Sequence, residues 1–177
     1  FVGAAGAGLG APPEYFGIIR EICDRYGVLM IVDEVITGFG RTGRNFGIDH
    51  WQVKPDLICA GKGVSSGYTP LGAVIASDEV FDGFRLGRGF VHGYTYGGNP
   101  LSCAIGVAVL EYIARHELIE RVARLEQHFF GKAGELEALE IVGEVRGKGF
   151  LMGIELVADK VTRRPFEASD AITAKVM

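Results

Sequence analysis

Three short apolar runs, each ended abruptly by polar residues or glycine, constrain the possible folds of this chain more than any other feature. They cover residues 28–32, 57–60 and 72–76. Continuous runs of this length are typical of strands that are buried on both faces, as in parallel sheets. A helical pattern of apolar residues over 15–26 precedes the first run, and Gly27 is placed to end that helix. Helices that alternate with buried strands predict an α/β fold with a mainly parallel sheet.

Two further helices are predicted in the second half of the chain. Asn99 and Pro100 make a good helix start, as N-cap and first helical residue, and we expect this helix to run to about Arg115. Apolar residues at helical spacing over 118–129 predict a second, amphipathic helix.

The domain organisation follows from a change in composition after about residue 140, where residues 150–157 resemble a strand of a different layer. We place a boundary near residues 112–120. Residues 1–115 then belong to a large domain, and residues 116–177 form a linker helix and the beginning of a smaller α/β domain. The sequence lacks an initiator methionine and ends inside a helical pattern, so we expect it to be an internal piece of a longer protein.

The composition argues against several classes of protein. The 177 residues are 48% hydrophobic and 23% charged with a net charge of −4, so no basic surface for nucleic acid is expected. No stretch approaches the roughly 18 apolar residues of a membrane span. The wide separation and odd number of Cys23, Cys59 and Cys103 predict reduced thiols in a cytoplasmic protein. The four histidines lack metal-ligand spacing, so no metal site is expected.

Two glycine-rich motifs resemble nucleotide-binding patterns but lack their context. The stretch GFGRTG at 38–43 matches the dinucleotide fingerprint, yet residues 45–49 do not continue as a helix. The stretch around Lys62 would be a phosphate-binding loop only with glycine at Asp56 and serine or threonine at Gly63. Glycines in tight turns explain both stretches better.

Lys62 and Asp33 are the two candidate functional residues. Taken alone, Lys62 is readily explained as a surface lysine in a turn, and Asp33 as a helix cap or ion-pair partner. Each, however, lies beyond the end of a predicted strand, where ligands bind in open α/β sheets. If these strands are neighbours, both side chains reach the same crevice. A lysine for the aldehyde and a carboxylate for the pyridine nitrogen are what pyridoxal 5'-phosphate requires.

Three segments together resemble the class III aminotransferases, which are fold type I enzymes dependent on pyridoxal phosphate. They are IVDEVITGFGRTG at 31–43, PDLICAGKGVSSGYTPLGAVIAS at 55–77 and HGYTYGGNPLSCA at 92–104. The segments occur in the order and spacing of that family, and the resemblance covers essentially the whole chain. It implies the large pyridoxal-phosphate-binding domain, a mainly parallel sheet between helices, and the start of the small domain.

The resemblance implies a role for each of five residues. Lys62 is expected to form the Schiff base with the cofactor, and Asp33 to pair with its pyridine nitrogen. Val35 is expected to pack against one face of the ring. Ile36 occupies the next position, where many relatives carry a glutamine near the ring hydroxyl. Thr95 resembles the threonine that reaches across a dimer interface to the neighbouring subunit's cofactor phosphate, so a homodimer or a dimer of dimers is expected.

The reaction implied by the resemblance is a ping-pong transamination through an aldimine on Lys62. An amine or ω-amino acid is expected as donor, and a keto acid such as pyruvate or 2-oxoglutarate as acceptor. An aminomutase or a decarboxylating transaminase of the same fold would share Asp33 and Lys62 and stays open. A non-catalytic fragment also stays open, because the family's phosphate cup and carboxylate-binding arginine fall outside these 177 residues. Arg41 and Arg146 are interpreted as structural.

Overall fold

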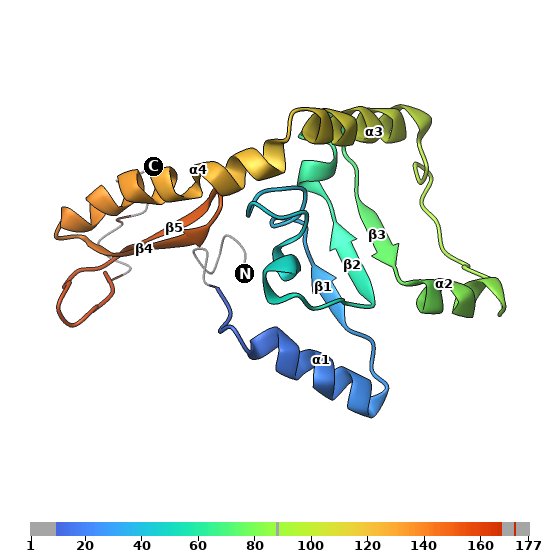
Figure 1. Ribbon diagram of the computed structural model, residues 1–177, viewed down its shortest axis with the longest axis horizontal. Coiled ribbons are helices and arrows are strands. Elements are labelled where there is room, and N and C mark those ends of the chain that lie inside the picture. Colours follow the sequence, from blue (N-terminus) through green and yellow to red (C-terminus); the bar gives the residue numbers. More distant parts are fainter. Residues whose placement is uncertain (1–9, 88, 168–171, 173–177) are drawn as a thin grey trace. The chain divides into compact units, whose positions relative to one another are not determined.

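The computed structural model describes residues 10–87, 89–167 and 172. One compact unit covers residues 11–124, and a second contains Gly10 and the described residues from Leu125 onward. The helices and strands (Figure 1) follow in the order α1 (Tyr15–Tyr26), β1 (Ile31–Asp33), η2 (Gly47–Trp51), β2 (Leu57–Ala60), η3 (Lys62–Val64), β3 (Ala73–Ala76), α2 (Asp78–Arg85), α3 (Pro100–Arg115), α4 (Leu118–Ala133), η4 (Gly134–Ala138), β4 (Val142–Lys148) and β5 (Leu151–Leu156).

The first unit is built on a three-stranded sheet in the order β1-β2-β3, with the strands side by side in Figure 1. β1 and β2 are parallel, and Asp33 pairs in register with Cys59. β2 and β3 are antiparallel, with Leu57 opposite Ala76. The predicted α/β class is confirmed, and the described sheet is mixed, with one parallel and one antiparallel pairing.

Two of the predicted helices have the ends that their sequence signals specify, whereas α4 runs to Ala133, beyond the predicted 118–129. α1 stops at Gly27, whose φ of 63° lies in the left-handed region that glycine adopts without strain. α3 starts with Pro100 in its first turn, and the Asn99 side chain accepts a hydrogen bond from the Ser102 N–H at 3.1 Å. Within residues 10–87, 89–167 and 172, no helix is long and apolar enough to cross a membrane.

A single carboxylate ties α1 to the beginning of both parallel strands. Asp56 Oδ2 accepts a hydrogen bond from the Met30 N–H at 2.6 Å and another from Arg20 Nη1 at 2.8 Å. The Met30 N–H, followed by the Arg20 guanidinium, holds the pKa of Asp56 below its ordinary value. Arg20 also pairs with Asp24 one helical turn further on at 2.7 Å. The charged network therefore fixes where α1 lies against the edge of the sheet at which β1 and β2 begin.

The strands are more exposed than their apolar sequences predict. Met30 and Ala60 are buried, but Ile31 is 62% exposed and Val74 in β3 is 65% exposed. The expectation of strands buried on both faces is therefore wrong for the described chain, because three strands and the helices beside them offer too few apolar neighbours to cover both faces. The first apolar run also joins the sheet only at Ile31, three residues later than predicted.

The helix α2 and the strand β4 were not predicted from the sequence, and neither were the short helices η2, η3 and η4. α2 has only eight residues, and its start is capped by Ser77 Oγ, which accepts a hydrogen bond from the Val80 N–H at 3.4 Å. β4 contains Gly143 and Gly147, which lower the strand propensity of its sequence.

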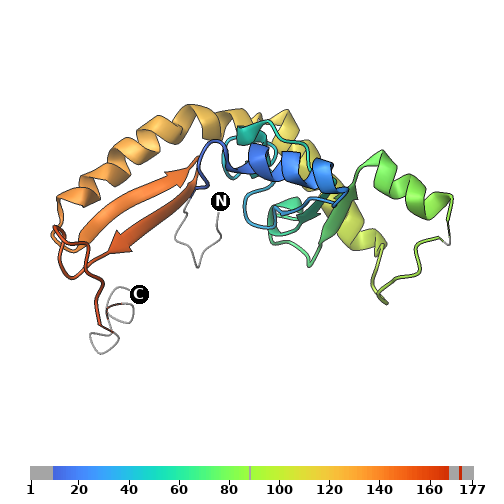
Figure 2. The same ribbon diagram turned by 90° about the horizontal axis from the view of Figure 1, so that it is seen from below.

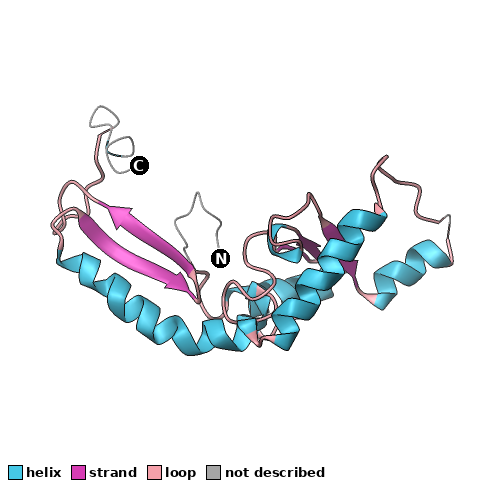
Figure 3. Ribbon diagram, turned by 90° about the horizontal axis from the view of Figure 1, so that it is seen from above, coloured by secondary structure: helices cyan, strands magenta, loops and turns pink. Residues whose placement is uncertain are grey.

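The second unit is an antiparallel hairpin of β4 and β5 with the C-terminal part of α4 running along it (Figures 2 and 3). Phe129 of α4 contacts Phe150 with ring centroids 5.2 Å apart. Glu126 Oε1 accepts a hydrogen bond from the Gly149 N–H at 3.0 Å, which ties the helix to the hairpin turn. The two compact units divide inside α4, between Arg124 and Leu125. The domain boundary near residues 112–120 stays a prediction.

Candidate active site

Asp33 and Lys62 follow neighbouring parallel strands at the same edge of the sheet. Asp33 is the last residue of β1 and pairs with Cys59 of β2. β2 ends at Ala60, and Lys62 opens the short helix η3 two residues later. The condition set by the sequence, that the two strands be neighbours, is therefore met. Both side chains are exposed at this edge, where open α/β sheets bind their ligands.

The Asp33 carboxylate is oriented by the turn that follows it. Its Oδ1 accepts a hydrogen bond from the Val35 N–H at 2.9 Å, a local pattern common to aspartates that begin turns. The next residue, Glu34, donates its own N–H to the Cys59 carbonyl at 2.8 Å and so extends the pairing with β2 by one residue. These two bonds fix the backbone on which Val35 and Ile36, both half-buried, present their side chains.

Lys62 has an unusual backbone conformation between two glycines. Its φ of 42° lies in the left-handed region, which costs a residue with a Cβ roughly 1–2 kcal/mol. A Cβ on Gly61 would lie 3.5 Å from Val35 Cγ1, and a Cβ on Gly63 would lie 3.1 Å from Phe39 Cβ. The backbone on both sides of Lys62 therefore packs against the segment that follows β1. Strained backbone held by its surroundings is a frequent property of functional sites.

Two hollows of the first unit adjoin Lys62 and the turn that contains Thr95, and the lining of neither includes Asp33. The first has a volume of about 500 Å³, and its lining includes Arg41, Lys62, Ser65, Ser66 and Thr69. The second has a volume of about 590 Å³, and its lining includes Tyr94, Tyr96, Asn99 and Ser102. Pro70 and Leu71 line both hollows, so the two are adjacent.

Thr95 lies in a turn away from the strand ends. The turn is closed by a hydrogen bond from the Gly97 N–H to the Tyr94 carbonyl at 2.9 Å, and Thr95 is exposed within it. Its neighbours Tyr94 and Tyr96 line the second hollow, whereas Lys62 lines the first. The structure thus brings Asp33 and Lys62 to one edge and leaves Thr95 on a separate exposed segment. The roles predicted for Asp33, Val35, Ile36, Lys62 and Thr95 stay predictions.

Arg146, interpreted as structural, belongs to an ion-pair cluster of the β4–β5 hairpin. Its Nη1 donates to Glu144 Oε2 at 2.6 Å and to Glu155 Oε2 at 3.3 Å. The hydrogen bond to Glu144 raises the pKa of Arg146 above its ordinary value, and the bond to Glu155 adds to this effect. Arg163 approaches the same two carboxylates at 3.5 and 3.7 Å. This arrangement holds the hairpin together and agrees with the structural interpretation.

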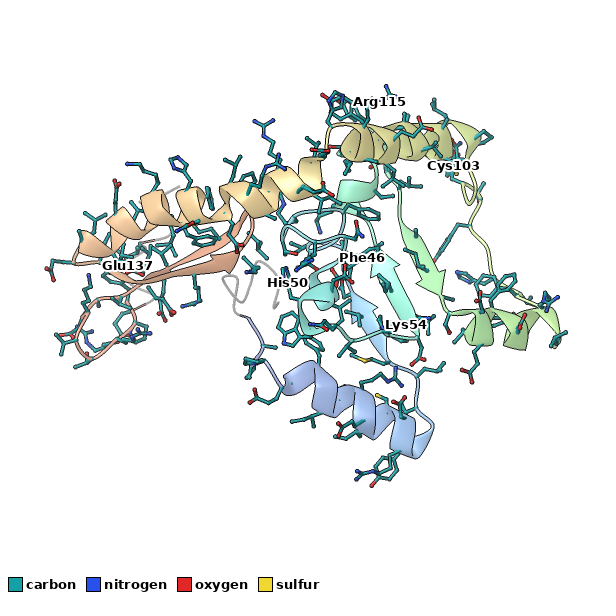
Figure 4. The ribbon with its side chains drawn as sticks, in the orientation of Figure 1. Phe46, His50, Lys54, Cys103, Arg115 and Glu137 are labelled. Carbon is teal, nitrogen blue, oxygen red and sulfur yellow. The ribbon has the colours of Figure 1, made fainter. Side chains whose placement is uncertain are left out.

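The buried residue Glu34 was not singled out in the sequence. It is 1% exposed, although it lies between two predicted site residues. Its Oε1 accepts a hydrogen bond from the Ile48 N–H at 2.7 Å, and its Oε2 accepts one from the Gly47 N–H at 2.8 Å. The Thr37 hydroxyl also donates to Oε2 in a short hydrogen bond. These partners lie in the connection from β1 to β2, in which Figure 4 labels Phe46 and His50.

The structure places a lysine and a carboxylate at the carboxyl ends of neighbouring parallel strands, the edge at which open α/β sheets bind ligands. The sequence comparison is specific: the chain matches the class-III aminotransferase family over residues 2–175 and belongs to that family. A probable aminotransferase of Mycobacterium tuberculosis is 47% identical over 163 residues, which are 92% of this chain and 35% of that protein.

Solved structures confirm that the fold is that of the fold type I transaminases. A transaminase from the marine bacterium Virgibacillus is 40% identical with a TM-score of 0.88, over 93% of this chain and 38% of that one. Taurine:2-oxoglutarate aminotransferase of Bifidobacterium kashiwanohense, in complex with pyridoxal phosphate and glutamate, is 37% identical with a TM-score of 0.89, over 97% of this chain and 39% of that one. The chain thus spans less than half the length of these proteins.

Proposed function

We propose that these residues form part of the active site of a transaminase that uses pyridoxal 5'-phosphate. The observation that carries the proposal is the position of Asp33 and Lys62 at one edge of the sheet, after neighbouring parallel strands. Membership of the class-III aminotransferase family supports the same conclusion. An aminomutase or a decarboxylating transaminase would use the same two residues, but the relatives named above are aminotransferases, which favours simple amino-group transfer.

The side chains at this edge fit the chemical groups of the cofactor. Lys62 offers a primary amine that can bind an aldehyde covalently, and Asp33 offers a carboxylate that favours a protonated pyridine nitrogen. Val35 and Ile36 would lie beside the ring. The exposed Thr95 hydroxyl would bind the cofactor phosphate of a neighbouring subunit, which implies a homodimer or a dimer of dimers. When bound, pyridoxal phosphate supplies a ring that accepts electrons from the substrate carbon.

Lys62 has two roles in this proposal. Its Nζ would hold the cofactor when no amine donor is bound. The same amine, when free, would accept a proton from the donor carbon as general base and later donate that proton as general acid. The exposed position of Lys62, at the rim of a hollow, leaves its side chain room to reach both partners.

The substrates proposed are an amine or ω-amino acid donor and a keto acid acceptor such as pyruvate or 2-oxoglutarate. The reaction would be ping-pong, because the donor leaves its amino group before the acceptor binds. The similarity to taurine:2-oxoglutarate aminotransferase supports a donor whose amine is remote from its acid group. A cytoplasmic location is part of the proposal and rests on the sequence pattern of Cys23, Cys59 and Cys103, which are free thiols.

The proposal is tested by trapping the cofactor on the lysine in the full-length protein. Purified protein is incubated with pyridoxal phosphate, its absorbance is recorded, and borohydride is added before peptide mass mapping. We expect a pyridoxyl adduct on Lys62 that is lost in Lys62→Ala. Lys54→Ala, at an exposed lysine of the same unit (Figure 4), serves as the matched control and should keep the adduct. A folded protein that forms no adduct on Lys62 would overturn the proposal.

A further inference from the structure

We propose that Glu34 is a positioning residue of the active site, whose buried carboxylate fixes the distance between Asp33 and Lys62. The inference rests on the function proposed above. Glu34 is buried immediately beside the exposed Asp33, so the two neighbouring acidic side chains have opposite environments. Asp33 faces the site, whereas Glu34 faces the loop beneath it.

The Glu34 carboxylate joins three parts of the connection between β1 and β2. It accepts hydrogen bonds from the Ile48 N–H at 2.7 Å, from the Gly47 N–H at 2.8 Å and from the Thr37 hydroxyl. All three partners are donors, and the carboxylate can accept from all of them because each of its two oxygens has two lone pairs; Oε2 accepts from both Gly47 and Thr37. A Cβ on Gly47 would lie 2.9 Å from Thr37 Cβ, so the loop already packs closely against the turn.

Main-chain hydrogen bonds of Glu34 link the anchored loop to Asp33. The Glu34 N–H donates to the Cys59 carbonyl at 2.8 Å, and its own carbonyl accepts from the Gly38 N–H at 2.9 Å. The turn between Asp33 and Gly38 is thereby held at both ends. Since Asp33 Oδ1 accepts from the Val35 N–H inside this turn, the direction of the Asp33 carboxylate depends on where Glu34 holds the turn.

The same turn supports the backbone on both sides of Lys62. Val35 Cγ1 lies 3.5 Å from the position of a Cβ on Gly61, and the Gly38 carbonyl lies 3.4 Å from that of a Cβ on Gly63. A shift of the turn therefore moves Asp33 and presses on the backbone that holds Lys62. Small errors in the placement of reacting groups are costly in enzymes, so a residue that controls both positions affects cofactor binding without touching the cofactor.

Glu34→Gln tests the hydrogen bonds of Glu34 without changing the size of its side chain. Glutamine has nearly the same size, but it offers one acceptor oxygen and an amide NH₂, which would face a donor and leave it unsatisfied. The turn and loop would then separate although the core volume is unchanged. Glu79→Gln, on the exposed surface of α2, is the matched control. Thr37→Val removes one of the three donors while keeping the shape of a β-branched side chain.

The experiment measures the dissociation constant of pyridoxal phosphate and the circular dichroism of the bound cofactor in full-length wild type and variants. We expect the dissociation constant to rise at least tenfold in Glu34→Gln and the cofactor dichroism to change, with a smaller rise in Thr37→Val and none in Glu79→Gln. These readouts do not depend on turnover, and far-UV circular dichroism establishes that each variant is folded. A role in stability alone would leave both cofactor readouts at their wild-type values.

Each outcome decides the inference. If Glu34→Gln is folded and binds pyridoxal phosphate as the wild type does, the positioning role is overturned while the proposed function stands. If Glu34→Gln does not fold, Thr37→Val decides: weaker cofactor binding supports the inference, and unchanged binding overturns it. If the wild type itself binds no cofactor on Lys62, the proposed function is overturned and the positioning role falls with it.

Discussion

Replacing Gly43 by alanine tests how closely the loop after β1 packs against the first turns of α4. Gly43 has a φ of 79°, and a Cβ there would lie 3.1 Å from the Ala123 Cα and 3.2 Å from its nitrogen. Both residues belong to the unit that covers residues 11–124. The neighbouring atoms are main chain of a helix and cannot rotate away, so the loop or the helix must shift.

The loss of stability expected for Gly43→Ala is worked out by comparison with Gly67→Ala. Gly67 has nearly the same φ, 83°, but a Cβ there would meet nothing within 4 Å. Left-handed strain of roughly 1–2 kcal/mol and the entropy lost from the unfolded chain are common to both variants and cancel in the difference. What remains for Gly43→Ala is overpacking, which typically costs about 1–3 kcal/mol. We therefore expect Gly43→Ala to be less stable than Gly67→Ala by about this amount.

The assay is denaturant-induced unfolding of wild type and both variants, followed by far-UV circular dichroism at one pH and temperature. The free energy of unfolding is obtained from the midpoint and the slope of each transition. Equal slopes establish that the same surface is exposed on unfolding. If the two variants differ by less than about 0.5 kcal/mol, the spread expected of surface substitutions, α4 does not approach Gly43 closely and the packing argument is wrong.

Three further predictions concern Asp33, Lys62 and the charged network around Asp56. Asp33→Ala should reduce turnover of the full-length protein by about a hundredfold or more, because the ring nitrogen of the cofactor would lose the carboxylate proposed to keep it protonated; near-normal steady-state rates would contradict this proposed role. Lys62→Gly should be more stable to denaturant than Lys62→Ala by about 0.5–1 kcal/mol, because φ at this position is 42°; equal stability would refute the strain. The pKa of Asp56 is lowered in the folded state, so its contribution to stability is complete above the unfolded pKa of about 3.9 and is lost as the pH falls through the lower folded value. Asp56→Asn should therefore lower the unfolding free energy at pH 7 and weaken its decline on acidification, and identical pH profiles would show that the charged network around Asp56 contributes nothing.

The elements that sequence reasoning found are those with strong local signals. β2 was predicted at its observed residues because the apolar run is bounded by Asp56 and Gly61. α3 was predicted from its first residues, since Asn99 and Pro100 specify a helix start whatever the rest of the fold. Fold class followed from the alternation of such elements, which depends little on their exact ends.

The missed strand β4 depends on its partner strand and has no strong signal of its own. β4 is a strand because it pairs with β5 over its length and because Arg146 joins Glu144 to Glu155 across the pair. The sequence of β4 contains glycines and charged residues but no alternation of apolar and polar residues. It therefore does not predict a strand. Burial was misjudged for a related reason: an apolar run indicates a strand, but the neighbours that cover it are not encoded in the run itself.

The candidate site likewise contains some residues that the sequence points to and one that it does not. Asp33 and Lys62 could be singled out as candidates because their chemical types and their positions after apolar runs are visible in the sequence. Glu34 could not, because its hydrogen-bond partners Gly47 and Ile48 lie 13 and 14 residues away and contribute only backbone N–H groups. A buried carboxylate with main-chain partners has no sequence signature beyond the glycine-rich loop that supplies the donors.

The parallel pairing of β1 with β2 has a consequence for how the protein acquires its site during folding. Residues 34–56 connect the two strands without an α-helix, containing only the short helix η2. Asp33 and Lys62 come together only when this long connection closes, and such non-local pairings form slowly because chain entropy is lost before contacts compensate for it. Cofactor capture during refolding should therefore lag behind helix formation. The time at which pyridoxal phosphate becomes bound during refolding would then mark when β1 and β2 pair. Following cofactor binding would therefore measure a late step in the folding of the chain.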